Sequence, residues 1–232
     1  MNRQGGRQGR LNATATSVRR MRFPKIYARS GLWIILIISL VWNVSMVLAP
    51  LTIPPGTVSG LYGGANRLDY GDLWSTLPPA QGTVYMLGDI ECHQIASRTI
   101  YINGNQMPVC ARDASLFLFL SFGFLMAAVV KPDIAISRML LRFLPAKVRS
   151  RLEKGMRPLF FTLFLSFICL APIALDGGLQ LVTSYESTNA LRFITGFPAG
   201  IFFGLILGLM IQSLQLPTPS RRAPVPEAPP PS

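Results

Sequence analysis

Four long apolar stretches, each nearly free of charged residues, divide the chain. They cover residues 32–49, 114–130, 158–175 and 190–214. A helix needs about 20 apolar residues to cross the hydrocarbon core of a bilayer. A buried helix of a soluble protein gives a similar pattern, but four such stretches in one chain favour a membrane protein. We therefore predict an all-α membrane protein with four transmembrane helices, which form a membrane domain over residues 31–216.

The segment between the first two predicted helices, residues 50–113, is long and mostly polar. Its first half is rich in Gly and Pro, and its second half contains the pair Asn103-Gly104. Asn and Gly tolerate the positive φ angles that a two-residue hairpin turn requires. A hairpin that closes there without irregularity places Ser97 across from Cys110. We expect a long outer loop that contains a small β-hairpin.

The basic residues are distributed unequally between the loops. Eight Lys and Arg residues precede the first helix, eight lie between the second and third, two follow the fourth, and four lie in the remaining loops. Lys and Arg accumulate in the short cytoplasmic loops of membrane proteins. The pattern predicts a multi-pass protein of the cell (inner) membrane with both termini in the cytoplasm. The loop over 50–113 is then extracytoplasmic.

The composition agrees with a membrane protein. Hydrophobic residues make up 50% of the chain and charged residues 14%, whereas a soluble domain carries about 25% charged residues. The net charge of +12 is explained by the loop bias, so we predict contact with the lipid bilayer and no nucleic-acid partner. The basic segment 1–30 and the Pro-rich segment 217–232 are predicted to be disordered tails. Apolar residues interleaved with arginines over 134–156 predict an amphipathic helix at the membrane surface.

A first cluster of chemically active residues lies in the second half of the outer loop. The hairpin brings Cys92 and His93 back toward Cys110 and Asp113. Three interpretations remain open. The thiols can form a Cys92–Cys110 disulfide in an oxidising compartment. The four side chains can instead bind a metal ion, for which zinc is the best candidate, because thiolate, imidazole and carboxylate all suit it. The thiols can also be free and the histidine buried without a special role.

A second polar cluster surrounds the loop between the third and fourth helices. Asp176 is expected to end the third helix, and the following Gly177-Gly178 permits a sharp turn. Asn189 and its two preceding residues can cap the fourth helix, and Arg192 lies one turn inside it. Free N–H groups at a helix start favour an anion. The alternative is a structural Asp–Arg pair that holds the helix ends together.

The fourth helix carries glycines at every fourth position. They are Gly196, Gly200, Gly204 and Gly208. A repeated GxxxG face lets another helix approach closely. The partner of this face is expected to be a helix of the same chain, a second copy in a homo-oligomer, or another membrane protein.

Two blocks of polar residues form the most specific motif of the chain. The first block comprises Cys92-His93-Gln94, Arg98 and residues 105–112, and the second comprises Asp176-Gly177, Gln180, residues 186–189, Arg192 and Thr195-Gly196. On these blocks the chain resembles, over about residues 85–208, a family of predicted prokaryotic membrane proteins, domain of unknown function 2085. Members often have a cysteine where this chain has Asp113, and an arginine where it has Tyr185. The resemblance implies the membrane fold and the position of the site, and it implies no activity.

The functional hypothesis places both blocks in one polar pocket on the extracytoplasmic side. In an enzyme that acts on a lipid or lipid-linked substrate, the acid–base or metal-binding groups are His93, Asp113 and Asp176. The side chains expected to bind an anion or substrate are Arg98, Arg112, Gln180, Asn189 and Arg192. The alternative is a non-catalytic binding or assembly module with a structural Cys92–Cys110 disulfide. Transport is disfavoured because four helices are few and their centres lack charge.

Overall fold

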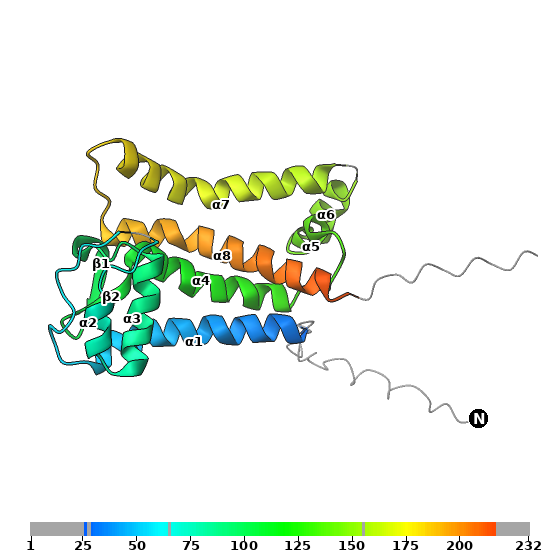
Figure 1. Ribbon diagram of the computed structural model, residues 1–232. Coiled ribbons are helices and arrows are strands. Elements are labelled where there is room, and N and C mark those ends of the chain that lie inside the picture. The colour runs from blue at the N-terminus through cyan, green and yellow to red at the C-terminus, as the bar shows by residue number, and fades with distance from the viewer. Residues whose placement is uncertain (1–25, 27–28, 65, 155, 217–232) are drawn as a thin grey trace, which may run out of the picture.

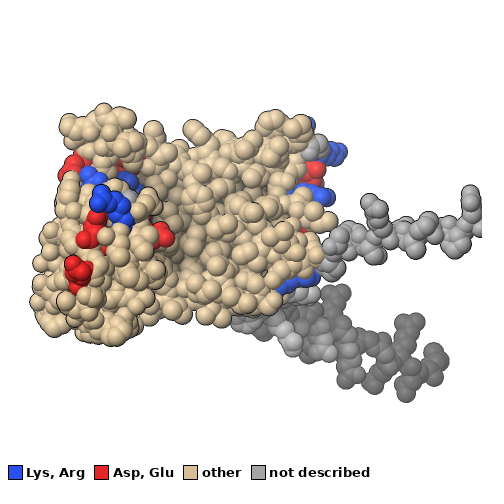
Figure 2. Space-filling model, viewed as in Figure 1, with Lys and Arg blue, Asp and Glu red and all other residues tan. Residues whose placement is uncertain are grey.

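A computed structural model describes residues 26, 29–64, 66–154 and 156–216. Four of its helices are long and apolar enough to cross a membrane, as predicted. They are α1 (Ser30–Thr52), α4 (Ala111–Ala128), α7 (Arg157–Val182) and α8 (Asn189–Leu214). Figure 1 shows α1, α4 and α8 side by side, with α7 along the outer side of α8. In Figure 2 the charged residues gather at the two ends of this bundle and leave an uncharged band between them.

Two of these helices extend beyond the predicted ends. α1 includes Pro50 and ends at Thr52. α7 continues through Gly177 and Gly178 to Val182, so the predicted turn after Asp176 is wrong. Glycine lowers helix stability by only about 1 kcal/mol relative to alanine, and tertiary contacts outweigh that cost. One such contact is the ion pair between Asp176 of α7 and Arg112 of α4.

The segment between α1 and α4 contains more secondary structure than the predicted loop with a hairpin. We call residues 53–110 the cap; it holds two short helices, a 3-10 turn and the predicted hairpin. These elements are α2 (Gly71–Thr76), α3 (Pro79–Glu91), η1 (Ala96–Arg98), β1 (Thr99–Ile102) and β2 (Asn105–Cys110). Trp74 of α2 stacks on Tyr85 of α3 with ring centroids 5.0 Å apart, and its indole N–H donates to the buried Asp89 carboxylate at 2.9 Å. The cap therefore has a core of its own.

The hairpin turns at Asn103 and Gly104, as predicted, with φ angles of 52° and 71°. Its register differs from the regular one, because Cys110 pairs with Thr99 and not with Ser97. The irregularity lies opposite a stretch of β2 that contains Pro108, and proline has no N–H to donate to a strand ladder. The bulge brings Cys110 to the start of α4.

Buried amide side chains connect segments of the cap, and one of them, Asn105, also connects the cap to the end of α1. Asn105 accepts from Val58 N at 3.0 Å and donates to Pro50 O at 3.0 Å. Gln94 donates to Pro108 O at 2.9 Å, and Gln106 accepts from Leu61 N at 3.2 Å. Unpaired amides in such positions would be costly, so these residues act in the architecture of the cap.

The glycine face of α8 packs against α4 of the same chain. A Cβ added at Gly196 would lie 2.7 Å from Arg112 O, and one at Gly200 would lie 2.5 Å from Leu116 O. At Gly204 the added atom would overlap the carbonyl of Leu120. The face is thus filled by a helix of the same chain, which is the first of the predicted partners.

The end of the bundle opposite the cap is the basic end. Figure 1 shows that α1 begins and α8 ends there. The predicted surface helix is in fact two short helices, α5 (Ile136–Leu141) and α6 (Ala146–Leu152), separated by a segment with Pro145. The tails predicted over 1–30 and 217–232 lie outside the described residues, except for Ile26, Arg29 and Ser30.

Candidate metal site and polar cavity

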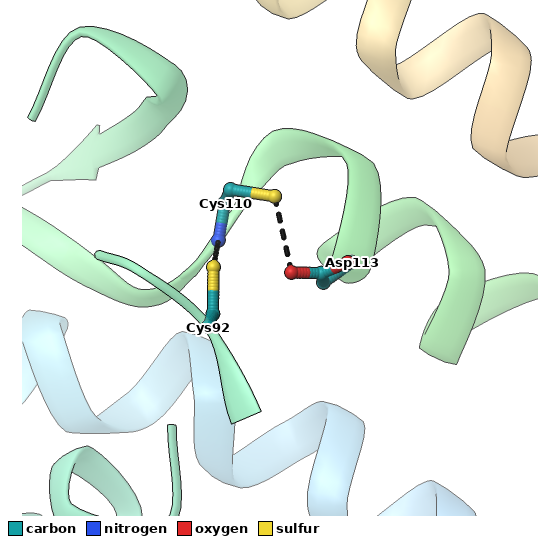
Figure 3. Close-up of side chains that lie close together, drawn as sticks. All are labelled: Cys92, Cys110 and Asp113. Carbon is teal, nitrogen blue, oxygen red and sulfur yellow. Dashed lines mark hydrogen bonds between the residues drawn. The ribbon is translucent and has the colours of Figure 1, made fainter. Parts of the chain in front are cut away.

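Two cysteines meet where α3 ends and α4 begins. Cys92 is the C-cap of α3, Cys110 is the N-cap of α4, and Asp113 lies in the first turn of α4. The backbone N–H of Cys110 donates to Cys92 Sγ at 3.3 Å, and Cys110 Sγ lies 3.1 Å from Asp113 Oδ2. Figure 3 shows the two thiols and the carboxylate grouped around this junction. The positive end of the α4 dipole favours negative charge at this point.

The three side chains offer ligand atoms of the right type and spacing for a metal ion. Two Sγ atoms and one carboxylate oxygen all lie within 4.8 Å of one another. In a tetrahedral zinc site with Zn–S bonds of about 2.3 Å, neighbouring sulfur ligands are roughly 3.8 Å apart. The limit of 4.8 Å between the three ligand atoms is close to this spacing.

Both cysteines of this cluster are free thiols. The interaction of Cys92 with Cys110, its burial and the nearby Asp113 carboxylate all raise the pKa of the Cys92 thiol far above its usual range. This direction favours the neutral thiol, and a metal ion would supply the positive charge that a thiolate requires. The structure has both cysteines as free thiols, and the disulfide stays a prediction for thiol counting to test.

His93 does not join the cluster, although the metal hypothesis included it. It lines the same cavity but its ring is not among the three grouped ligands. The chain is extended at Cys92, and successive side chains of an extended chain point to opposite sides. The imidazole of His93 and the thiol of Cys92 are therefore expected to point to different sides of the chain.

A cavity of about 370 Å³ brings the two sequence blocks together. Its lining side chains come from the cap, α4, α7 and α8. They include Cys92, His93, Arg98, Cys110, Arg112, Asp113, Gln180 and Arg192. Residues some sixty positions or more apart in the sequence, such as Asp113 and Gln180, thus face one space.

Asp176 and Asn189 do not line this cavity, but each contacts an arginine that does. Asp176 is 6% exposed and forms an ion pair with Arg112, and Tyr185 Oη donates to its second oxygen at 3.1 Å. The structural pair predicted for Asp176 therefore exists, but with an arginine of α4. Asn189 donates to Thr99 O at 3.1 Å and accepts from Arg192 Nη1 at 3.2 Å, which positions Arg192.

Comparison with known proteins places the chain in a family. The family model of predicted membrane proteins called DUF2085 matches residues 92–206. An uncharacterised protein of Methanocaldococcus jannaschii is 31% identical over 167 residues, which cover 72% of this chain and 83% of that protein. The chain belongs to the DUF2085 family.

A second DUF2085 relative is an uncharacterised protein of Methanothermobacter thermautotrophicus. It is 31% identical over 110 residues, which cover 47% of this chain and 78% of that protein. No solved structure matches the chain. The DUF2085 match begins at Cys92, so it contains both polar blocks and leaves out α2 and α3 of the cap.

The sequence hypothesis missed three residues that line the cavity. Glu91 and Ile95 flank the Cys92-His93 motif, and Leu181 follows Gln180 on α7. Leu181 was missed because α7 was expected to end before it. Glu91 was missed because its position next to Cys92 does not by itself indicate a role in a site.

Proposed function

We propose that this DUF2085 protein binds a divalent metal ion, zinc in the first place, through Cys92, Cys110 and Asp113. The observation that carries the proposal is the grouping of two free thiols and a carboxylate within 4.8 Å. Zinc takes thiolate and carboxylate ligands in tetrahedral sites. The same residues line the polar cavity, so a fourth coordination position would be open to a ligand or water from that cavity.

Three protein ligands and one open position are the pattern of catalytic zinc sites, whereas structural sites are closed by four protein ligands. This favours an enzyme over a purely structural centre. The bound ion would act as a Lewis acid on an oxygen of the substrate. His93, which lines the cavity, is the candidate for proton transfer, and Asp176 with Arg112 would hold the cavity wall in place.

The proposal predicts about one zinc ion per chain. Elemental analysis of the full chain, purified in mild detergent with a reducing agent, measures the ion directly. We expect Cys92→Ser and Cys110→Ser to lower zinc affinity by at least about tenfold, since each removes a ligand and even second-shell changes have effects of this size. Cys169→Ser is the matched control, because Cys169 lies on α7 and outside the cluster.

Counting the free thiols of the same samples separates the alternatives. Zinc with three reactive thiols after denaturation supports the metal centre. Two blocked thiols without zinc would instead establish a Cys92–Cys110 disulfide and contradict the proposal. Zinc loss of the same size in Cys169→Ser would show that the ion is not bound at this cluster.

We further propose that the cap faces the non-cytoplasmic side and the basic end faces the cytoplasm. The support is the excess of Lys and Arg at the basic end. A cysteine introduced at the exposed Ser75 of α2 should react with an impermeant thiol reagent in intact cells, and one at the exposed Ser150 of α6 should not. Labelling is measured as the increase over the parent chain with its native cysteines. The reverse labelling pattern would invert the orientation.

A further inference from the structure

The polar cavity is surrounded by hydrogen-bond donors that lack acceptors. Within the described part of the chain, four lining side chains have a buried nitrogen without a hydrogen-bond partner. They are Arg98 (Nε), Arg112 (Nε), Gln180 (Nε2) and Arg192 (Nη2). Buried donors without partners are costly, and none of the lining side chains has a buried acceptor in the same state. The cavity therefore suits a ligand rich in acceptors.

Arg192 is the central member of this group. It is 2% exposed. Within the described residues, its guanidinium donates one hydrogen bond, to the amide oxygen of the neutral Asn189. Arg112 is paired with Asp176, and Arg98 lies 3.3 Å from Glu186. Within the described residues, Arg192 has no carboxylate partner. A buried arginine without a counter-charge is expensive, so an anion is the missing component.

We infer that the cavity binds a phosphate group, with Arg192 as its principal ligand. The four donors come from η1, α4, α7 and α8, and so approach one space from several directions. A phosphate presents several acceptor oxygens around a tetrahedral centre, and arginine binds it through charge-assisted hydrogen bonds. The inference rests on the proposed function in one respect, because it names the ligand class of the same cavity.

An adjoining apolar cavity indicates where such a phosphate would come from. It has a volume of about 450 Å³ and is lined mainly by apolar side chains of α1, α3, α4 and α8, among them Trp42, Ile90 and Phe117. Glu91 lines both cavities, and it is exposed, so its charge is screened by solvent. A phospholipid with its phosphate at Arg192 would have acyl-chain space beside it, and free phosphate would use the polar cavity alone.

The test uses the full chain in mild detergent and two probes, dioleoylphosphatidic acid and inorganic phosphate. Dioleoylglycerol, which has the same acyl chains without phosphate, is the reference. Ligand-dependent rises in the thermal unfolding midpoint report affinity. We expect phosphatidic acid to bind at least about tenfold more tightly than dioleoylglycerol, and Arg192→Gln to weaken it about tenfold to a hundredfold, the range for a hydrogen bond to a charged group.

Two further variants keep the test decisive. Gln180→Met removes a hydrogen-bond donor from the cavity without removing a charge. Like Arg192→Gln, it should weaken the binding of phosphatidic acid. Arg67→Gln is the control: it makes the same substitution at an exposed arginine of the cap, which pairs with Asp69. This variant should bind phosphatidic acid as tightly as the parent protein does. Inorganic phosphate that binds as tightly as phosphatidic acid, with the same dependence on Arg192, upholds the phosphate site and identifies a soluble source.

Zinc content measured in the same samples separates this inference from the proposed function. Zinc-loaded protein whose affinity for both phosphate probes is unchanged by Arg192→Gln and by Gln180→Met overturns the phosphate site and leaves the metal centre standing. Phosphate binding that depends on Arg192 in zinc-free protein supports the phosphate site and removes the metal centre. Equal weakening in Arg67→Gln would also overturn the inference, since a general loss of positive charge would then explain it.

Discussion

Replacing Gly204 by leucine should destabilise the protein by at least about 3 kcal/mol, the upper end of the usual cost of overpacking. The backbone of Leu120 on α4 occupies the space that any side chain at this position would need. A carbonyl of a helix cannot rotate away as a side chain can, so α4 and α8 must separate. Separation also loses van der Waals contact along the glycine face, which drives helix association in membranes.

The matched control is Gly178→Leu on α7. An added Cβ there meets nothing within 4 Å, so we expect a change of about 1 kcal/mol or less, with the gain in helix propensity in its favour. Thermal unfolding of both variants in mild detergent, followed by circular dichroism, measures the difference. Equal midpoints for the two variants would contradict the close packing of α4 on α8.

The sequence pattern was sufficient for the membrane helices and insufficient for the cap. Long apolar stretches and the Asn103-Gly104 turn carry strong local signals, and the structure shows four long apolar helices and the hairpin. α2 and α3 were missed because glycines and prolines over 50–82 usually indicate loops. Proline is tolerated at the first position of a helix, which is where Pro79 lies in α3.

The members of the candidate site were more predictable than their pairing. Residue chemistry identified Cys92, Cys110 and Asp113, because thiols and carboxylates near a turn are few in this chain. Which arginine meets Asp176 depends on how α7 lies against α4, and local pattern contains no information on that distance. The bulge near Pro108 likewise shifted the partner of Cys110, since hairpin register follows from turn length only when the ladder is regular.

Removing the carboxylate of Asp176 should be the most damaging single change near the cavity. Its side chain is 4% exposed and that of Arg112 is 19% exposed. Breaking a buried ion pair by removing one partner costs about 3–5 kcal/mol, because the other charge remains without compensation. We expect Asp176→Ala to lower the free energy of unfolding by about 3 kcal/mol, because Arg112 keeps some contact with solvent. Unfolding in detergent measures it.

A second variant shows whether the cost comes from the stranded charge. In Asp176→Ala combined with Arg112→Met, no buried charge is left alone, and we expect part of the lost stability to return. The control is Glu153→Ala, whose partner Arg149 is 3.4 Å away in an exposed pair; such pairs contribute about 0–1 kcal/mol. If Asp176→Ala is as stable as Glu153→Ala but no longer binds phosphatidic acid, Asp176 belongs to the binding site itself. Its ion pair would then not be what holds α7 against α4.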